Sequence, residues 1–134
     1  MAEHNELGKQ GEHEALLYLM KKGYTLHDKN WRSGHLEIDI VAEWWGEMVF
    51  VEVKTRRDEH FAPAADAVTL HKKRNLIAAG RAYLAEHGLM DCPYRYDVIT
   101  VVGTERPFRL THLENAYTEK GVWEEGHPHS GNVL

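Results

Sequence analysis

The sequence predicts an α/β domain in which one helix precedes three strands and a second helix separates these from a fourth strand. Three patterns indicate this αβββαβ order: apolar residues at helical spacing near the start, two β-rich runs that form a hairpin, and a capped helix followed by another β-rich run. At 134 residues the chain fits one compact domain, which we place at residues 1–123. Residues 124–134 are polar, contain Gly and Pro, and are expected to form a flexible tail.

The first helix is predicted from Asn5, a capping residue, to Gly23, which follows two lysines. Glu12 lies on its stripe of apolar and small residues, in a position where a core residue is expected. Gly8 and Gly11 would let this helix approach the sheet closely and bring Glu12 toward the strands. A glutamate inclined to solvent at the margin of the stripe fits the pattern equally well.

Three strands are predicted next, at residues 24–31, 36–43 and 48–55. Gly46 lies in the short connection between the second and the third strand, so these two form a hairpin. The third strand opens with four consecutive apolar residues, which is typical of a central strand covered on both faces.

The remaining elements are a loop, a helix, a strand, and a short edge strand with a helical turn behind it. In order they occupy residues 58–66, 69–88, 94–102, 108–113 and 115–117. Thr69 is expected to cap the helix and Gly88 to end it.

The composition is that of an ordinary soluble globular protein, with 43% hydrophobic and 28% charged residues. Because Cys92 is the only cysteine, and neither a leader nor an apolar run of about 20 residues is visible, we expect a cytoplasmic protein with no membrane span. The net charge of −5 argues against a dedicated nucleic-acid binder. Residues 52–81 nevertheless carry more basic than acidic side chains, so a basic face remains compatible with this charge.

Two charged residues continue the third strand beyond its apolar run. Alternation places Glu52 and Lys54 on the same face as Phe50, while the valines at 49, 51 and 53 point to the other face. A carboxylate and an ammonium group therefore share the end of a largely buried strand face.

A third charged residue, Asp39, interrupts the partner strand. Alternation places it on one face and its neighbours Ile38 and Ile40 on the opposite one. If hairpin pairing brings Asp39 and Glu52 together, two carboxylates at about 4 Å repel by roughly 4 kcal/mol at an effective dielectric near 20. A cation would compensate this repulsion. Mg²⁺ or Mn²⁺ suits the arrangement, because such ions prefer oxygen ligands and Mg²⁺ binds through one or two carboxylates plus substrate phosphate.

Lys54 lies two residues beyond Glu52, where it could orient or deprotonate an attacking water or stabilise charge on a scissile phosphate. The alternative is that Asp39, Glu52 and Lys54 form an ordinary ion-pair network on a solvated edge. A solvated face should be polar along its whole length, whereas Phe50 and Val41 make this one apolar up to the charged end. The pattern therefore favours a metal site of the kind that hydrolyses phosphodiester bonds.

Five basic residues are candidates for contacts to a nucleic-acid backbone. Arg56 and Arg57 follow the charged strand directly, so their closeness to a scissile phosphate gives them the stronger claim. Lys72, Lys73 and Arg74 open the second helix, where a solvated basic face is the usual explanation and phosphate contact is the alternative.

At these residues the chain resembles the small bacterial YraN-like family, within the PD-(D/E)XK restriction-endonuclease-like superfamily that also holds archaeal Holliday-junction resolvases. A single E-x-K triplet is a weak motif, but six ordered pieces with compatible spacing are specific. They are Gly8-Lys-Gln-Gly-Glu12, Asn30-Trp-Arg32, Glu37-Ile-Asp39, Phe50-Val-Glu-Val-Lys-Thr-Arg56, Lys72-Lys-Arg74 and Arg95-Tyr-Asp-Val98.

The resemblance implies a restriction-endonuclease-like αβββαβ core with a mixed central sheet flanked by helices. It implies further that Asp39 and Glu52 ligate the metal, that Lys54 completes the catalytic triplet, and that Glu12 lies nearby. Ile38 stands where the superfamily's name has a proline, a position that does not ligate metal. The implied substrate is nucleic acid, with branched DNA and repair intermediates among the expected forms.

We therefore expect a metal-dependent endonuclease that acts on DNA by Mg²⁺-assisted phosphodiester hydrolysis. The alternative is a non-catalytic nucleic-acid-binding or repair-complex module of the same fold, because a fold alone does not fix a function. A third class, a purely structural interaction protein, would make the carboxylates an ordinary ion network. Symmetric cutting of two strands would favour a two-fold homodimer.

Overall fold

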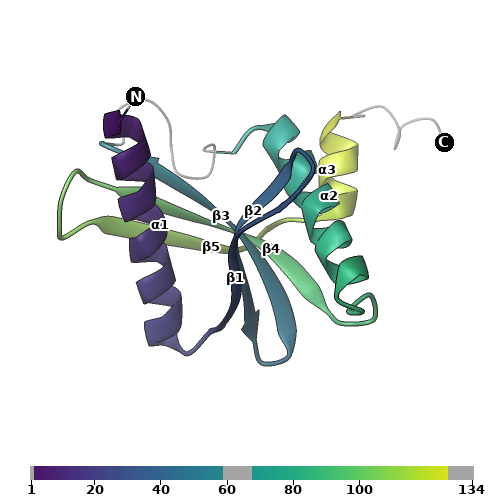
Figure 1. The fold of residues 1–134 in the computed structure, drawn as a ribbon. Helices are drawn as coiled ribbons and strands as arrows, with labels where there is room; N and C mark the ends of the chain where they lie inside the picture. The colour runs from purple at the N-terminus through teal and green to yellow at the C-terminus, as the bar shows by residue number, and fades with distance from the viewer. Residues whose placement is uncertain (1, 59–67, 127–134) are drawn as a thin grey trace.

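A computed structural model describes residues 2–58 and 68–126 of the chain, and Figure 1 shows their arrangement. This part contains five strands and three helices in the order α-β-β-β-α-β-β-α, which confirms the α/β class and is consistent with a restriction-endonuclease-like core. The elements are α1 (Ala2–Lys22), β1 (Thr25–Ser33), β2 (Leu36–Trp44), β3 (Glu47–Arg56), α2 (Leu70–Glu86), β4 (Tyr94–Val102), β5 (Arg109–Tyr117) and α3 (Glu119–Gly126).

The five strands form one mixed sheet whose spatial order follows the chain, β1-β2-β3-β4-β5. All neighbouring strands are antiparallel except β3 and β4, which run parallel because α2 carries the chain back between them. Helix α1 covers one face of the sheet, whereas α2 and α3 lie on the other (Figure 1). The mixed sheet flanked by helices is thus as predicted. No helix in the described part of the chain combines the length and apolar character needed to cross a membrane.

Two apolar cores lie on opposite faces of β3, as its run of four apolar residues predicted. Val49 and Val51 pack on the α1 side with Leu19 of the helix, and Met48 and Phe50 pack on the α2 side. Because all four of these strand residues are buried, β3 is the central strand around which both layers are organised.

The N-terminal cap of α2 is the one that the sequence predicts. Thr69 Oγ1 accepts a hydrogen bond from the Lys72 N–H at 3.2 Å. The helix ends at Glu86, shortly before Gly88, whose φ of +67° is in the left-handed region that favours glycine. This end agrees with the expected stop.

Other boundaries differ from the prediction. Helix α1 begins at Ala2 instead of after Asn5. The helical turn expected at 115–117 is wrong, because β5 continues to Tyr117 and α3 begins only at Glu119.

Tertiary contacts explain the longer β5. The Asn115 N–H donates to Asp97 of β4 at 2.9 Å, and Tyr117 pairs with Tyr96 across a bulge. These long-range contacts override the local preference for a turn.

The predicted loop and tail fall mostly outside the described residues. Of the loop at 58–66, only Asp58 is described. Of the expected tail, residues 124–126 belong to α3, and residues 127–134 lie outside the description. The domain boundary placed at residue 123 therefore falls inside a helix.

Helix α1 approaches β3 closely at Gly11. A Cβ added to Gly11 would overlap the Thr55 side chain, with Thr55 Cβ only 2.9 Å away, so rotation of Thr55 would not remove the clash. A Cβ added to Gly8 would meet nothing within 4 Å. The expected close approach is therefore found at Gly11 and not at Gly8.

We expect Gly11→Ala to lower the free energy of unfolding by about 1–2 kcal/mol, because overpacking outweighs the gain in helix propensity. The matched control Gly8→Ala should raise it by about 0.5–1 kcal/mol through propensity alone. Urea denaturation followed by circular dichroism measures both. Equal effects of the two substitutions would contradict the close approach.

Candidate functional site

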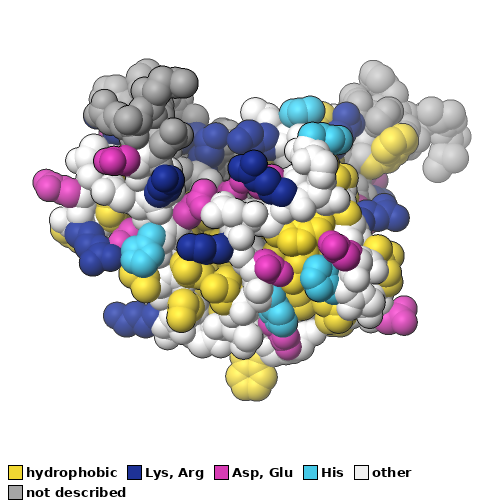
Figure 2. All heavy atoms as spheres, viewed as in Figure 1, with side chains coloured by type: hydrophobic (Ala, Val, Ile, Leu, Met, Phe, Trp, Pro, Cys, Tyr) yellow, Lys and Arg dark blue, Asp and Glu magenta, His cyan; other side chains and the backbone are white. Residues whose placement is uncertain are grey.

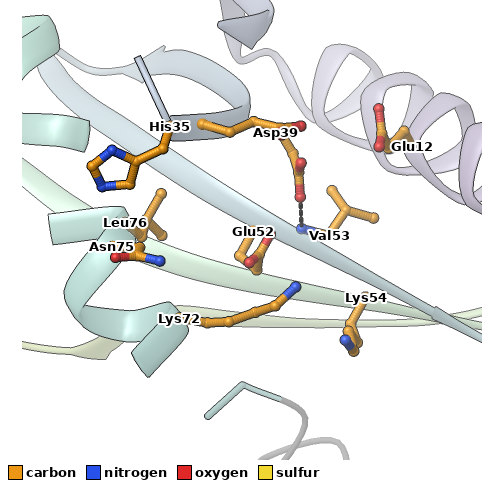
Figure 3. Close-up of a pocket in the computed structure, with 10 residues that line it drawn as sticks. Glu12, His35, Asp39, Glu52, Val53, Lys54, Lys72, Asn75 and Leu76 are labelled. Carbon is orange, nitrogen blue, oxygen red and sulfur yellow. Dashed lines mark hydrogen bonds between the residues drawn. The ribbon is translucent and has the colours of Figure 1, made fainter. Parts of the chain in front are cut away.

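One cavity of about 290 Å³ gathers the charged residues singled out in the sequence, where β2 and β3 face the first turns of α2. Figure 2 shows Lys and Arg side chains beside Asp and Glu side chains in the upper middle of the face between α1 and α2. The side chains drawn in Figure 3 border the cavity: Glu12, His35, Glu37, Asp39, Glu52, Val53, Lys54, Lys72, Asn75 and Leu76.

Asp39 is positioned by a hydrogen bond to the backbone of the neighbouring strand. Register pairing between β2 and β3 ends at Ile40 and Val51. Beyond that point, the Val53 N–H donates to Asp39 Oδ2 at 2.8 Å (Figure 3). The Val53 N–H lies beyond the last backbone pair between β2 and β3, and the Asp39 carboxylate accepts its hydrogen bond. This bond orients the Asp39 side chain beside Glu52.

The predicted alternation of β2 is wrong at this point. Ile40 packs in the core on the α1 side, as expected for one face, but Ile38 packs in the core on the α2 side. Asp39 therefore lies at an irregularity in β2, where the side chains before and after it point to opposite faces of the sheet. Opposite it in β1, Asn30 has a φ of +52°, a value uncommon for residues other than glycine.

Because of this switch, Asp39 borders cavities on both sides. It lines the cavity with Glu52 and also a second cavity of about 360 Å³ on the α1 side. Glu12 of α1 lines both cavities as well, so the helix does bring this carboxylate toward the strands.

Glu52 and Asp39 form an interacting pair of carboxyl groups. Burial, a hydrogen bond to Asp39 and the charge of Asp39 raise the pKa of Glu52 to about 9, while the charges of Lys72 and Lys54 oppose the shift. Hairpin geometry therefore brings Asp39 and Glu52 together, as the sequence indicated, and their mutual repulsion is only partly offset by the lysines.

Glu12 belongs to the surroundings of this pair. Burial and the charge of Asp39 raise its pKa, and a hydrogen bond to Asn30 opposes the shift. Within residues 2–58 and 68–126, no group of three or more His, Cys, Asp or Glu side chains is arranged to hold a metal ion. Glu12 is thus near Asp39 without completing a three-carboxylate cluster.

The basic residues divide between the cavity and its surroundings. Lys54 lines the cavity from β3, and Lys72 enters it from α2 with its ammonium group toward Glu52 (Figure 3). Lys73 Nζ instead donates to Glu125 Oε1 of α3 at 3.3 Å. Arg74 is exposed on α2.

The two arginines at the end of β3 lie beyond the Glu52–Lys54 pair. Arg56 is half-buried. Arg57 is exposed and borders a separate cavity of about 190 Å³ beside the first turns of α1.

Three polar residues of the cavity were not among the predicted site residues: His35, Glu37 and Asn75. Asn75 follows Lys72 by three residues on α2, so helical spacing from Lys72 was the signal that could have identified it. His35 lies in the β1–β2 turn, and its approach to the cavity depends on how the hairpin bends.

Asp97 is part of a buried polar network away from this cavity. It accepts hydrogen bonds from Arg95 Nε at 2.9 Å, His112 Nε2 at 2.7 Å and the Asn115 N–H at 2.9 Å. Burial alone would raise the pKa of Asp97, but the hydrogen bonds from His112, Arg95 and Asn115 outweigh it and hold the pKa below its usual value. The network ties β4 to β5, which supports a structural role for Asp97.

Comparisons with known proteins identify relatives over most of the chain. A family model described as "Uncharacterised protein family UPF0102" matches residues 11–101, a range that contains Glu12, Asp39, Glu52 and Lys54. A UPF0102 protein of Phocaeicola vulgatus is 49% identical over 117 residues, which cover 87% of this chain and 96% of the relative. One from Porphyromonas gingivalis is 40% identical over 87% of each chain, and one from Lawsonia intracellularis is 35% identical over 84% of this chain and 85% of the relative.

We expect Glu52→Gln to stabilise the protein at alkaline pH. Because the folded state raises the pKa of Glu52 from 4.5 to about 9, ionisation of this group destabilises the fold, and the wild type loses stability as the pH rises between these values. The neutral amide escapes this loss. Near pH 8, Glu52→Gln should therefore have a higher free energy of unfolding than the wild type, and the difference should shrink toward pH 4.5.

Urea denaturation across this pH range measures the difference. The control Glu86→Gln removes an exposed carboxylate of α2 and should stay within about 0.5 kcal/mol of the wild type. A constant offset between Glu52→Gln and the wild type at all pH values would contradict the assigned cause.

Proposed function

We propose that this chain, which belongs to the uncharacterised protein family UPF0102, is a metal-dependent endonuclease that hydrolyses phosphodiester bonds in DNA. Membership confirms the resemblance to the YraN-like family, and the family description names no activity. The observation that carries the proposal is the Asp39–Glu52 pair, which lines one cavity together with Lys54 and Lys72.

The donor set suits a hard divalent cation. Two carboxyl groups lie close enough for one to raise the pKa of the other, so positive charge between them would relieve a repulsion that the lysines offset only in part. Carboxylate oxygens are the ligands that Mg²⁺ prefers, and Mg²⁺ typically uses one or two of them plus substrate phosphate. Asp39 and Glu52 would hold Mg²⁺ or Mn²⁺, which when bound supplies positive charge for the phosphate and a more acidic water.

In this proposal Lys54 acts on the substrate itself. It follows Glu52 on the same strand face, roughly 7 Å further along, and lines the same cavity. From there its ammonium group would bind a non-bridging phosphate oxygen and orient the attacking water. Lys72 enters from the opposite wall and would neutralise charge on the phosphate, while Glu12 would hold a water by hydrogen bonding beside Asp39.

The charge around the cavity supports nucleic acid as the proposed substrate class. Lys72 and Arg74 lie on α2, and Arg56 is the last residue of β3 with Arg57 directly after it, so basic side chains lie on two sides of the carboxylates. Such a face favours a polyanion that extends beyond the cavity, despite the net charge of −5. Branched DNA and repair intermediates are the forms that the resemblance favours, cut by a homodimer in the cytoplasm.

A second candidate is a non-catalytic nucleic-acid-binding module of the same fold. The observation that favours it is that the described residues hold a carboxylate pair and not a three-member ligand cluster. Binding and cleavage assays on the same substrates separate the two candidates.

We expect the wild type to cleave single-stranded, duplex, flap or four-way DNA in the presence of Mg²⁺ or Mn²⁺. Asp39→Asn, Glu52→Gln and Lys54→Ala should each lower the rate by about a hundredfold or more, because the first two remove proposed ligands of the metal and the third removes positive charge beside the phosphate. The control Glu43→Gln alters a carboxylate of β2 that pairs with His27 at 2.8 Å and should retain the wild-type rate.

The cleavage experiment has two informative negative outcomes. A wild type that binds DNA but cuts none of the four substrates with either metal would favour the non-catalytic module. Cleavage that survives Lys54→Ala unchanged would exclude this cavity as the active site.

We expect Lys72→Ala to weaken DNA binding more than Lys73→Ala, because Lys72 lines the cavity whereas Lys73 donates to Glu125. If Lys72 contacts a phosphate, its loss should also lower the slope of log K against log[salt] by about 1. Fluorescence anisotropy at several salt concentrations measures both quantities. Identical slopes for the wild type and Lys72→Ala would contradict the contact.

A further inference from the structure

Two buried hydroxyl groups lie without a hydrogen-bond partner in the described part of the chain, those of Tyr117 and Thr100. Buried polar groups are normally paired, so an unpaired one calls for an explanation. Tyr117 packs in the core on the α2 side. Val98 packs there too, and Thr100 follows it by two residues in β4, so strand alternation places Thr100 on the same face. This is the sheet face that carries Glu52 and Lys54.

Tyr117 lies on the same sheet face as Glu52, in a neighbouring row of laterally paired side chains. Its ring stacks on Tyr96 with centroids 5.7 Å apart and planes 3° apart. In the parallel register of β3 and β4, Tyr96 is beside Phe50 and Val98 is beside Glu52. Because Tyr117 of β5 is beside Tyr96, its ring lies one row away from the Glu52 row along the sheet and two strands away from β3.

Side chains from the first turns of α2 lie over Tyr117 and Glu52. Lys73 Nζ lies 5.7 Å from the centroid of the Tyr117 ring, and the adjacent Lys72 directs its ammonium group toward Glu52 (Figure 3). Burial and then the charge of Glu52 raise the pKa of Tyr117. The hydroxyl therefore stays protonated at neutral pH and keeps its proton available for donation to an acceptor.

The neighbouring tyrosines differ from Tyr117 because their hydroxyl groups have hydrogen-bond acceptors. Tyr94 and Tyr96 both donate to Glu119 Oε1, at 2.9 Å and 3.1 Å. Tyr117 carries the same donor group in the same aromatic cluster, yet its hydroxyl has no acceptor among the described residues. After burial, the charge of Glu52 contributes most to the raised pKa of Tyr117.

We propose that Tyr117 is a positioning residue of the candidate metal site, whose hydroxyl donates a hydrogen bond to the Glu52 carboxylate when Glu52 serves as a metal ligand. The inference rests on the proposed function, because it assigns a partner to Glu52 in that role. Carboxylates that ligate metals are themselves commonly held by hydrogen bonds, and loss of such a partner weakens metal binding.

The test is a calorimetric Mn²⁺ titration of the full chain, with urea denaturation of the same samples without added metal. Tyr117→Phe removes only the hydroxyl oxygen. We expect it to weaken Mn²⁺ binding by about tenfold and to leave the urea midpoint unchanged or higher, since no existing hydrogen bond is lost. The control Tyr96→Phe should lower the urea midpoint, because it breaks the bond to Glu119, and leave Mn²⁺ affinity unchanged.

The outcomes separate this inference from the proposed function. Equal Mn²⁺ affinities of the wild type and Tyr117→Phe, with binding abolished by Glu52→Gln, would overturn the positioning role and leave the metal site standing. A lowered urea midpoint for Tyr117→Phe with unchanged affinity would make the hydroxyl purely structural. A wild type that binds no Mn²⁺ would overturn the metal site and this inference together.

Discussion

The hydrogen bond from the Val53 N–H to Asp39 Oδ2 is the interaction on which the candidate site depends. It lies where register pairing between β2 and β3 stops, and it satisfies a backbone donor with a side chain instead of a strand carbonyl. Strands β2 and β3 can therefore diverge while the Val53 N–H keeps a hydrogen-bond acceptor. The same bond orients the Asp39 carboxylate beside Glu52, and the space between the strands and α2 becomes the cavity.

This arrangement is electrostatically costly for the fold and useful for chemistry. Burial and Asp39 raise the pKa of Glu52, so an ionised pair is disfavoured unless positive charge compensates it. Lys54 and Lys72 supply part of that charge from β3 and α2. Close contact of α1 with β3 at Gly11 places Glu12 at the cavity as well. Such a balance is typical of functional sites, where stability is often sacrificed for activity.

The elements predicted well are those in which local pattern and tertiary packing agree. Strand β4 was expected at residues 94–102 and lies there, because eight of its nine residues are buried and five of these eight are apolar. Strand β5 was predicted too short, because Asn115 and Tyr117 are held by partners on β4 that no local signal reveals. Gly8 and Gly11 look alike in sequence, and only the position of Thr55 distinguishes them.

The sequence by itself determined the order of the elements, the central place of β3, and the identity of the charged residues that interrupt the hairpin, since these follow from periodicity and composition. Only the tertiary structure decided that Ile38 and Ile40 face opposite cores and that Asp39 stands at the switch between them. It also decided that Lys72, and not Lys73, enters the cavity. The physical reason is that strand divergence and helix docking are set by contacts between distant residues, which a local pattern does not encode.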